Sequence, residues 1–364
     1  MKRSLTLLLF CATLIACATA PSRADYLITE PILITPKAAP DADLKPEERD
    51  YNDLFALAND RFDAGDLDTA SRYYHDILTH NPAYRNAPFC YYNLGLIALK
   101  RHDHEKAQAE FKAAYFTLGS PADKADALLL RLYSLSRLAR WEEIADDADA
   151  ALSGDLAAMP VADPAVRETL LRRAEARAML GAPEEARRTA QYVIFEIRRE
   201  HPPRETFFIP ELALAYFVMG RAVVAEFAAL PFDATLDRLV AKCTLIQEAQ
   251  RWFLQTIQVG VIYWTNAAAY ELAALYRALF DEMNAYPVPD ALSGEERAVY
   301  ACELWEKTAG LLRKARRTLA GSIESAKRIH EQNEFIDDSL RLLIEVNAAY
   351  AEKDSLCRPG GLTP

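Results

Sequence analysis

The run HDHE at residues 102–105 carries the nitrogen and oxygen donors that bind zinc in proteins. It lies between two stretches with helical periodicity, where polar turn residues are expected whatever their function. His75 and His80 are five residues apart, so they do not share one helical face as residues four apart would. The interpretation as a solvated turn is favoured, and we expect no metal site.

Other catalytic constellations are weak as well. The sequence contains no GxGxxG, P-loop, GxSxG or HExxH string. The glutamate pairs at 142–143 and 184–185 come where helices should begin, and there a negative charge stabilises the positive end of the helix. Trp252, Trp264 and Trp305 lie in apolar stripes with helical spacing, which favours core packing. We therefore expect no catalytic residue and no cofactor, and a metal-dependent enzyme is the least favoured function.

The residue with the clearest reaction chemistry is Cys17. It ends the string LIAC, directly after the apolar run Leu5–Ala16, which itself follows Lys2 and Arg3. This run is shorter than the roughly 20 residues that span a bilayer and is typical of an export signal. LIAC resembles the lipobox of bacterial lipoproteins, in which the cysteine is lipidated and becomes the mature N-terminus. The resemblance implies a signal peptide over residues 1–16 and a lipid anchor on Cys17.

Two alternatives to lipidation remain. Ordinary signal cleavage could follow Ala20, but Pro21 would then stand directly after the cut and disfavour it, and Cys17 could also be a chance cysteine in a hydrophobic leader. With more than one acyl chain, at about 0.8 kcal/mol per buried methylene, Cys17 would hold the protein stably to a membrane. Ala18 and Thr19 follow it without an aspartate, which by resemblance implies the outer membrane of a bacterial envelope, facing the periplasm.

Composition indicates a folded, helix-rich body behind this anchor. Hydrophobic residues are 51% and charged residues 26%, and only 12 glycines occur in 364 residues, well under the norm of about 7%. Loss of residues 1–16 removes two positive charges and takes the formal net charge from −11 to −13. A surface of this charge argues against a nucleic-acid partner.

Four cysteines follow Cys17 in the sequence: Cys90, Cys243, Cys302 and Cys357. They are widely spaced and form no CxxC pair, and an even number would permit disulfides in an oxidising periplasm. Cys90, Cys243 and Cys302 lie within apolar helical patterns. We therefore expect buried thiols rather than disulfides.

Residues 17–49 contain five prolines and cannot form one continuous helix, so they are expected to be a flexible tether. Within this tether, the similar β-prone strings YLIT and ILIT flank Glu30 and Pro31. Such a segment is either a plain linker or an apolar segment that docks on another surface.

From Tyr51 onward the apolar spacing becomes helical and repeats. Two amphipathic patterns flank Gly65, and Pro82 ends the unit. This unit resembles the tetratricopeptide repeat (TPR), a helix-turn-helix of 34 residues in which small residues let the paired helices approach closely. The matching positions are Leu54, Leu57, Ala58, Gly65, Ala70, Tyr74, Ile77 and Pro82.

Further units follow at 88–119, 125–152 and 167–194, with His102 standing where the second unit should have its turn glycine. Longer helical patterns cover residues 206–229, 233–258 and 261–284, and after a proline-rich break the ranges 294–332 and 335–353 are expected to be helical. The sequence therefore predicts an all-α, right-handed superhelical solenoid of TPR hairpins, with longer TPR-like helices and a capping helix at the C-terminus. The expected organisation is a signal peptide (1–16), a tether (17–49), about four repeats (50–200), an extended TPR-like region with a cap (204–353) and a disordered tail (354–364).

As a whole the chain resembles bacterial TPR lipoproteins, a layout shared by outer-membrane assembly lipoproteins and by envelope proteins of motility machinery. In TPR proteins the concave wall is built from first-helix positions. The corresponding candidate residues for a partner-binding groove are Phe55, Asn59, Phe62, Phe89, Tyr92, Leu96, Leu99, Leu129 and Tyr133. Such an apolar and aromatic wall favours an apolar peptide or helix as the partner. The alternative is that neighbouring helices simply cover these side chains.

The expected function is that of a non-enzymatic, membrane-anchored scaffold that binds protein or peptide partners in the cell envelope, in outer-membrane assembly, secretion or motility. A transport accessory lipoprotein that holds a small apolar solute in a helical cavity is the alternative.

Overall fold

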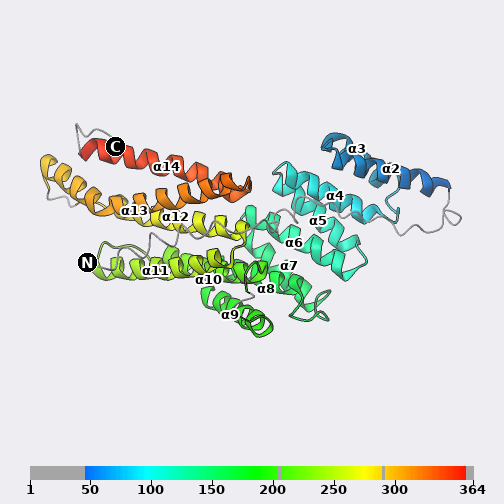
Figure 1. The fold of residues 1–364 in the computed structure, drawn as a ribbon, viewed down its shortest axis with the longest axis horizontal. Coiled ribbons are helices and arrows are strands. Elements are labelled where there is room, and N and C mark those ends of the chain that lie inside the picture. Colours follow the sequence, from blue (N-terminus) through cyan, green and yellow to red (C-terminus); the bar gives the residue numbers. More distant parts are fainter. Residues whose placement is uncertain (1–45, 203–205, 289–291, 358–364) are drawn as a thin grey trace.

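The computed structural model describes residues 46–202, 206–288 and 292–357, with side chains from residue 51 onward (Figure 1). The predicted signal peptide at 1–16, Cys17, most of the tether and the end of the tail lie outside the described residues. Within them, the regular elements are thirteen α-helices, α2–α14, without a strand. This confirms the all-α fold class.

The first eight helices form four consecutive hairpins, as the repeat pattern predicts (Figure 1). Their bounds are α2 (Pro46–Asp63) and α3 (Leu67–His80), α4 (Ala87–Lys100) and α5 (His104–Thr117), α6 (Pro121–Arg137) and α7 (Trp141–Ser153), and α8 (Pro164–Met179) and α9 (Pro183–Glu200). Prolines stand in the first turn of α4, α6, α8 and α9, where a missing N–H costs nothing.

In the turn inside each of these four hairpins, one residue has a left-handed backbone conformation with positive φ. Gly65 and Gly181 adopt φ of 77° and 88°, and His102 and Ala139 take the same turn position with φ of 57° and 54°. A side chain makes this conformation cost about 1 kcal/mol or more, so packing of the two helices must impose it at the second and third turns.

Small residues let the paired helices approach, as the repeat register predicts. Ala58 and Ala70 are completely buried, and so is Tyr74, which fills the space behind them. In the second hairpin, a Cβ atom on Gly95 would lie 2.6 Å from the Phe111 ring. Only glycine fits that position without movement of the ring.

The C-terminal part has longer helices. They are α10 (Pro210–Ala229), α11 (Leu236–Val259), α12 (Ile262–Ala285), α13 (Gly294–Arg328) and α14 (Glu334–Cys357). Figure 1 shows α13 and α14 lying beside α12, at the end of the molecule opposite to α2 and α3. The last helix continues to Cys357, so residues 354–357 belong to it rather than to the predicted tail.

A disulfide joins Cys302 in α13 to Cys357 at the end of α14, with the two Cα atoms 5.2 Å apart. The expectation that Cys302 is a buried thiol was wrong. The reason is tertiary: α13 and α14 form a hairpin that brings together two residues 55 positions apart. Cys90 is fully buried and free as predicted, whereas Cys243 is free and only half-buried.

Helix α10 is the one described helix that is long and apolar enough to cross a bilayer. It lies instead in the middle of the fold, where it packs against α8, α9, α11 and α12. Most of its side chains are buried among these helices. Its apolar character is therefore explained by its place in the core.

Candidate functional site

The nine residues predicted to line a partner-binding groove all lie on the first helices α2, α4 and α6. Seven of them are between 4% and 7% exposed: Phe55, Phe62, Tyr92, Leu96, Leu99, Leu129 and Tyr133. Asn59 and Phe89 are half-buried. The register is as predicted, but these side chains do not form an open apolar wall, and their role in binding stays a prediction.

Their contacts explain part of this burial. The Asn59 side-chain oxygen accepts hydrogen bonds from the Tyr74 hydroxyl at 2.5 Å and from the Asn93 amide at 3.2 Å. The Tyr92 ring packs edge-on against Phe111, with centroids 5.6 Å apart. Asn59 therefore joins two neighbouring hairpins and does not resemble a free ligand-binding amide.

The run HDHE is divided between structural roles. The Asp103 carboxylate accepts from the Lys106 backbone N–H at 3.0 Å and caps α5, which is what the solvated-turn interpretation predicts. His104 packs edge-on against Tyr133, and burial followed by the charge of Arg137 lowers its pKa. Within the described parts of the chain, no group of three or more possible ligands comes together for a metal.

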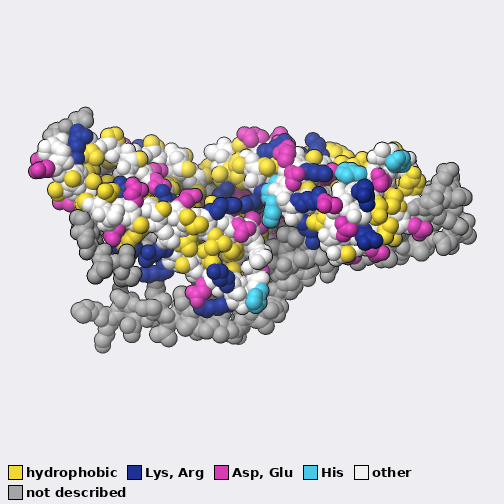
Figure 2. All heavy atoms as spheres, turned by 90° about the horizontal axis from the view of Figure 1, so that it is seen from above, with side chains coloured by type: hydrophobic (Ala, Val, Ile, Leu, Met, Phe, Trp, Pro, Cys, Tyr) yellow, Lys and Arg dark blue, Asp and Glu magenta, His cyan; other side chains and the backbone are white. Residues whose placement is uncertain are grey.

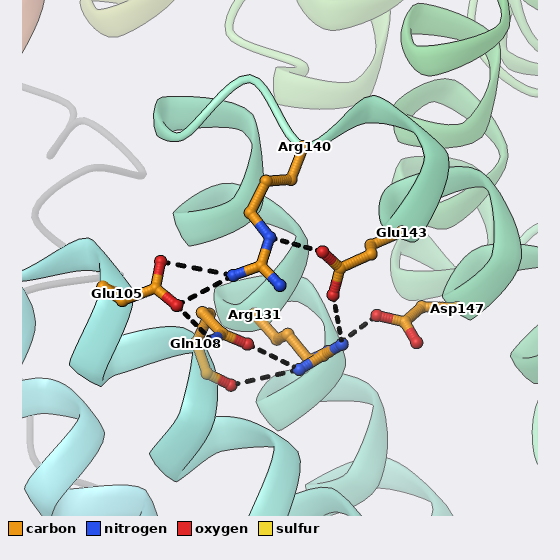
Figure 3. Close-up of polar contacts among 6 residues, drawn as sticks. All are labelled: Glu105, Gln108, Arg131, Arg140, Glu143 and Asp147. Atoms are coloured by element: carbon orange, nitrogen blue, oxygen red, sulfur yellow. Dashed lines mark hydrogen bonds and ion pairs between the residues drawn. The ribbon is translucent and has the colours of Figure 1, made fainter.

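A polar network links the second hairpin to the third (Figure 3). At its centre is Arg131 of α6, 3% exposed, whose Nε donates to Asp147 of α7 at 2.6 Å. Its Nη1 donates to the side-chain oxygen of Gln108 in α5 at 2.8 Å. The guanidinium thus spans α5 and α7 from α6.

Arg140 completes this network at its exposed edge. It binds Glu143 at the start of α7 and donates to Glu105 of α5 at 2.9 Å (Figure 3). The three carboxylates and two guanidiniums of this network are paired with one another. The network sets how one hairpin stacks on the next.

The C-terminal helices return to the N-terminal hairpins at a second polar site. Glu334, the first residue of α14, accepts from the hydroxyls of Tyr133 in α6 at 2.8 Å and Tyr263 in α12 at 2.7 Å. One turn later Asp338 pairs with Arg137 of α6 at 3.0 Å. The contacts of Tyr133 and Arg137 join residues 201 positions apart and make α14 a clasp between the two halves.

A cavity of about 100 Å³, the junction cavity, lies where α6, α8, α10 and α12 meet this clasp. It is lined by Ser136, Arg137, Trp141, Arg172, Glu175, Phe217, Arg221, Tyr263, Trp264, Glu271 and Phe335. Arg172 is 4% exposed and lies over the Trp264 ring at 5.2 Å. Arg221 pairs with Glu271 at 2.5 Å and with Glu175 at 3.5 Å.

The ion pairs of the junction cavity oppose a large cost of burial. Burial lowers the pKa of Arg172, but Glu168 and Glu175 outweigh it, and the pKa is raised overall. Burial raises the pKa of Glu271, and Arg221 opposes that rise. The Nε of Arg172 has no hydrogen-bond partner among the described residues. A cavity of this size with unmet donors suits water or a small polar group rather than an apolar solute.

Sequence reasoning missed these paired arginines of the interior, of which Arg131 is buried and Arg221 is half-buried. Arg131 stands in the apolar string LLLRLY and Arg221 in VMGRAVV. A charge inside an apolar run is the available signal, because such a residue is rarely buried unless it is paired. The pairing carboxylates could not be identified, since they lie on other helices.

The hairpins and their buried packing positions define an all-α protein built from consecutive helix hairpins. No protein-family model matches the chain, and no curated protein matches it.

Several solved structures similar to this chain are TPR proteins. One is a tetratricopeptide repeat protein from Parabacteroides merdae ATCC 43184, with 16% identity and a TM-score of 0.38 over 81% of this chain and 99% of that one. Another is the C-terminal part of a TPR repeat-containing protein from Cytophaga hutchinsonii, with 11% identity and a TM-score of 0.39 over 84% and 99%. A third is a TPR repeats protein from Bacteroides fragilis NCTC 9343, with 15% identity and a TM-score of 0.29 over 72% and 98%.

Proposed function

We propose that the protein is a non-enzymatic scaffold, anchored through a lipid on Cys17, that binds protein partners in the bacterial cell envelope. The observation that carries this proposal is the stack of helix hairpins. A repeat solenoid exposes extended surfaces on which a partner chain can lie, and each hairpin adds to them. The anchor is proposed to lie in the outer membrane and to face the periplasm.

The disulfide between Cys302 and Cys357 supports the envelope setting. Disulfides persist in oxidising compartments such as the bacterial periplasm and are rare in the cytosol. The export signal and the lipobox string at Cys17 point to the same compartment independently. The junction cavity, with ionised groups in its lining, gives no support to the alternative function of holding an apolar solute.

The anchor is tested by Cys17→Ser. We expect this variant to leave the membrane fraction or to accumulate as an unprocessed precursor. A variant that stays in the membrane fraction at the normal mature mass would contradict lipidation at Cys17.

Partner binding is tested by crosslinking in the native host, followed by mass spectrometry of the captured proteins. Phe89 of α4 and Phe116 of α5 belong to the same hairpin, on its first and second helix. Phe89 is the half-buried aromatic of the predicted groove, and Phe116 is 71% exposed on the second helix. We expect Phe89→Ala to reduce capture and Phe116→Ala to preserve it.

If Phe89→Ala leaves capture unchanged, the partner site does not lie on the first helices. Circular dichroism spectra that coincide with the parent protein provide the folding control for both variants.

A further inference from the structure

A groove of about 560 Å³ opens between α9, α10 and α11. We call it the α9–α11 groove, and its main lining residues are Ile194, Phe195, Arg198, Tyr216, Arg251 and Trp252. Its volume lies within the range of about 300–1,000 Å³ that is common for ligand sites. Neither the predicted first-helix groove nor the junction cavity contributes to it.

The floor of the α9–α11 groove is aromatic. The rings of Tyr216 and Trp252 are stacked, with centroids 6.2 Å apart and an angle of 22° between their planes. Phe195 stands at the rim and is 62% exposed. Stacked rings of this kind offer a flat apolar surface on which aliphatic side chains of a bound peptide can be buried.

Two arginines give this groove a positive charge, although the chain as a whole has a net charge of −11. Arg198 lies over the Tyr216 ring at 5.8 Å and donates to its hydroxyl at 2.5 Å. Arg251 lies over the Trp252 ring at 5.2 Å, and its nearest carboxylate is Glu248 at 3.7 Å. No carboxylate is among the residues that line the groove.

An apolar, aromatic floor and two guanidiniums are the chemistry that this groove offers. Together they are complementary to an extended apolar peptide that carries a carboxylate.

We propose that the α9–α11 groove binds residues Tyr26–Pro36 of this chain. This segment, YLITEPILITP, has two aliphatic runs around a single carboxylate, Glu30, which complements the two guanidiniums. Pro31 lacks an N–H and disfavours a helical Glu30, so the segment is suited to bind in an extended form.

Docking would also orient the protein on the membrane. Between Cys17 and Tyr26 stand eight residues, which span at most about 30 Å when fully extended. The face that contains the α9–α11 groove would therefore lie close to the bilayer. This consequence rests on the proposed function through the lipid on Cys17, whereas docking itself does not.

The test uses the otherwise complete soluble chain, with Cys17→Ser, and a matched version that lacks residues 26–36. A labelled synthetic peptide YLITEPILITP is titrated into both and followed by fluorescence polarisation. We expect it to bind the deletion version and to bind the complete version at least about tenfold more weakly, because the chain's own segment competes. Equal affinity for both versions at every protein concentration would overturn the proposal, and so would no binding to the deletion version.

Charge recognition is tested in the deletion version. Arg198→Ala combined with Arg251→Ala should weaken peptide binding at least about tenfold, the loss expected for a charge-assisted hydrogen bond. A peptide with Glu30→Lys should lose as much against the parent groove. Arg188→Ala, an exposed arginine on α9 outside the groove, is the matched control and should bind the peptide normally. Unchanged affinity in the double arginine variant would assign the peptide to another surface.

The same samples separate two geometries of docking. If the mass of the protein in solution rises with concentration, and the double arginine variant abolishes this rise, the bound segment belongs to a neighbouring copy. A constant monomer mass with the competition described above assigns it to the same copy, and both results support the proposal. Failure of Cys17→Ser to release the protein from membranes would contradict the anchor without affecting these titrations.

Discussion

The hairpin of α4 and α5 and the hairpin of α10 and α11 are built around the same contact. Gly95 faces Phe111 in the first, and Gly220 faces Phe253 in the second, where an added Cβ atom would lie 2.4 Å from the ring. The helices differ: α4 and α5 have 14 residues each, whereas α10 has 20 and α11 has 24. The C-terminal part therefore keeps the repeat contact and extends the helices around it.

Ion pairs bridge helices in both halves, but the C-terminal half adds a disulfide. In the N-terminal hairpins, polar networks such as that of Arg131 bridge neighbouring helices (Figure 3). In the C-terminal half, Trp305 packs between Phe280 and Tyr350, and the disulfide ties α13 to α14. Aromatic packing and a covalent link therefore hold the long helices α13 and α14 to their neighbours.

Apolar side chains are exposed in both halves, for example Phe116 at 71% and Ile344 at 70%. Figure 2 shows acidic and basic side chains interspersed on one face, with hydrophobic side chains gathered between them. On α14, Leu340 and Ile344 are 39% and 70% exposed one turn apart. Helix α14 therefore carries apolar side chains on its outside.

The largest effect should come from the disulfide. Cys302→Ser combined with Cys357→Ser opens a loop of 55 residues, which should lower the free energy of unfolding by about 4 kcal/mol. Chemical denaturation with and without a reductant measures this loss. Hydrogen exchange should place the loss in α13 and α14 rather than in α2–α5. If amide protection falls equally in α2–α5 and in α13–α14, the disulfide does not stabilise the C-terminal half specifically.

The shared glycine contact should respond alike in the two halves. Gly95→Ala and Gly220→Ala each place a methyl group within 3 Å of ring atoms of Phe111 or Phe253, and each should cost about 3 kcal/mol of stability. Thermal melts of the two single variants compare them directly. Gly321→Ala is the control, because a Cβ atom there meets nothing within 4 Å. A large loss for Gly95→Ala with none for Gly220→Ala would end the structural equivalence of these hairpins.

In the N-terminal half, the buried polar network of Arg131 should contribute more to stability than an exposed ion pair does. Arg131→Leu leaves Asp147 and Gln108 without their shared partner and should cost about 2 kcal/mol. The matched control is Arg101→Leu, which breaks an exposed pair with Asp68 and should cost at most about 1 kcal/mol. Urea denaturation measures both variants. Equal losses would show that burial does not strengthen the network.

The smallest effect concerns pH at the boundary between the halves. Burial, followed by Arg137, lowers the pKa of His104 below its usual 6.5, so the unfolded state binds the proton more readily. Stability is therefore lost as pH falls from about 6.5 toward the lower folded pKa. His104→Gln should reduce the fall in melting temperature between pH 7.5 and 5.5. Part of the fall should persist, because burial also lowers the pKa of His75. An unchanged pH profile in His104→Gln would rule out this contribution.

The sequence was sufficient for the hairpins, and the reasons are local. The helical spacing of the sequence places Ala58 on the buried side of α2, and Ala70 and Tyr74 on the buried side of α3. Gly65 permits the left-handed turn between these two helices. The proposed lipid anchor also rests on a contiguous string, and Cys17 stays a prediction because it lies outside the described residues.

Only the tertiary structure decided what happens to the side chains that these helices carry. Tyr133, a candidate residue of the partner-binding groove, donates to Glu334, about 200 residues away, and Cys302 is bonded to Cys357 across the α13–α14 hairpin. Tyr216 and Trp252 form one groove with Arg198 because three helices bring them together. Helical periodicity determines which side of its own helix a residue occupies. Whether that side is open or covered depends on the sum of small rotations between successive hairpins, and no short stretch of sequence contains that sum.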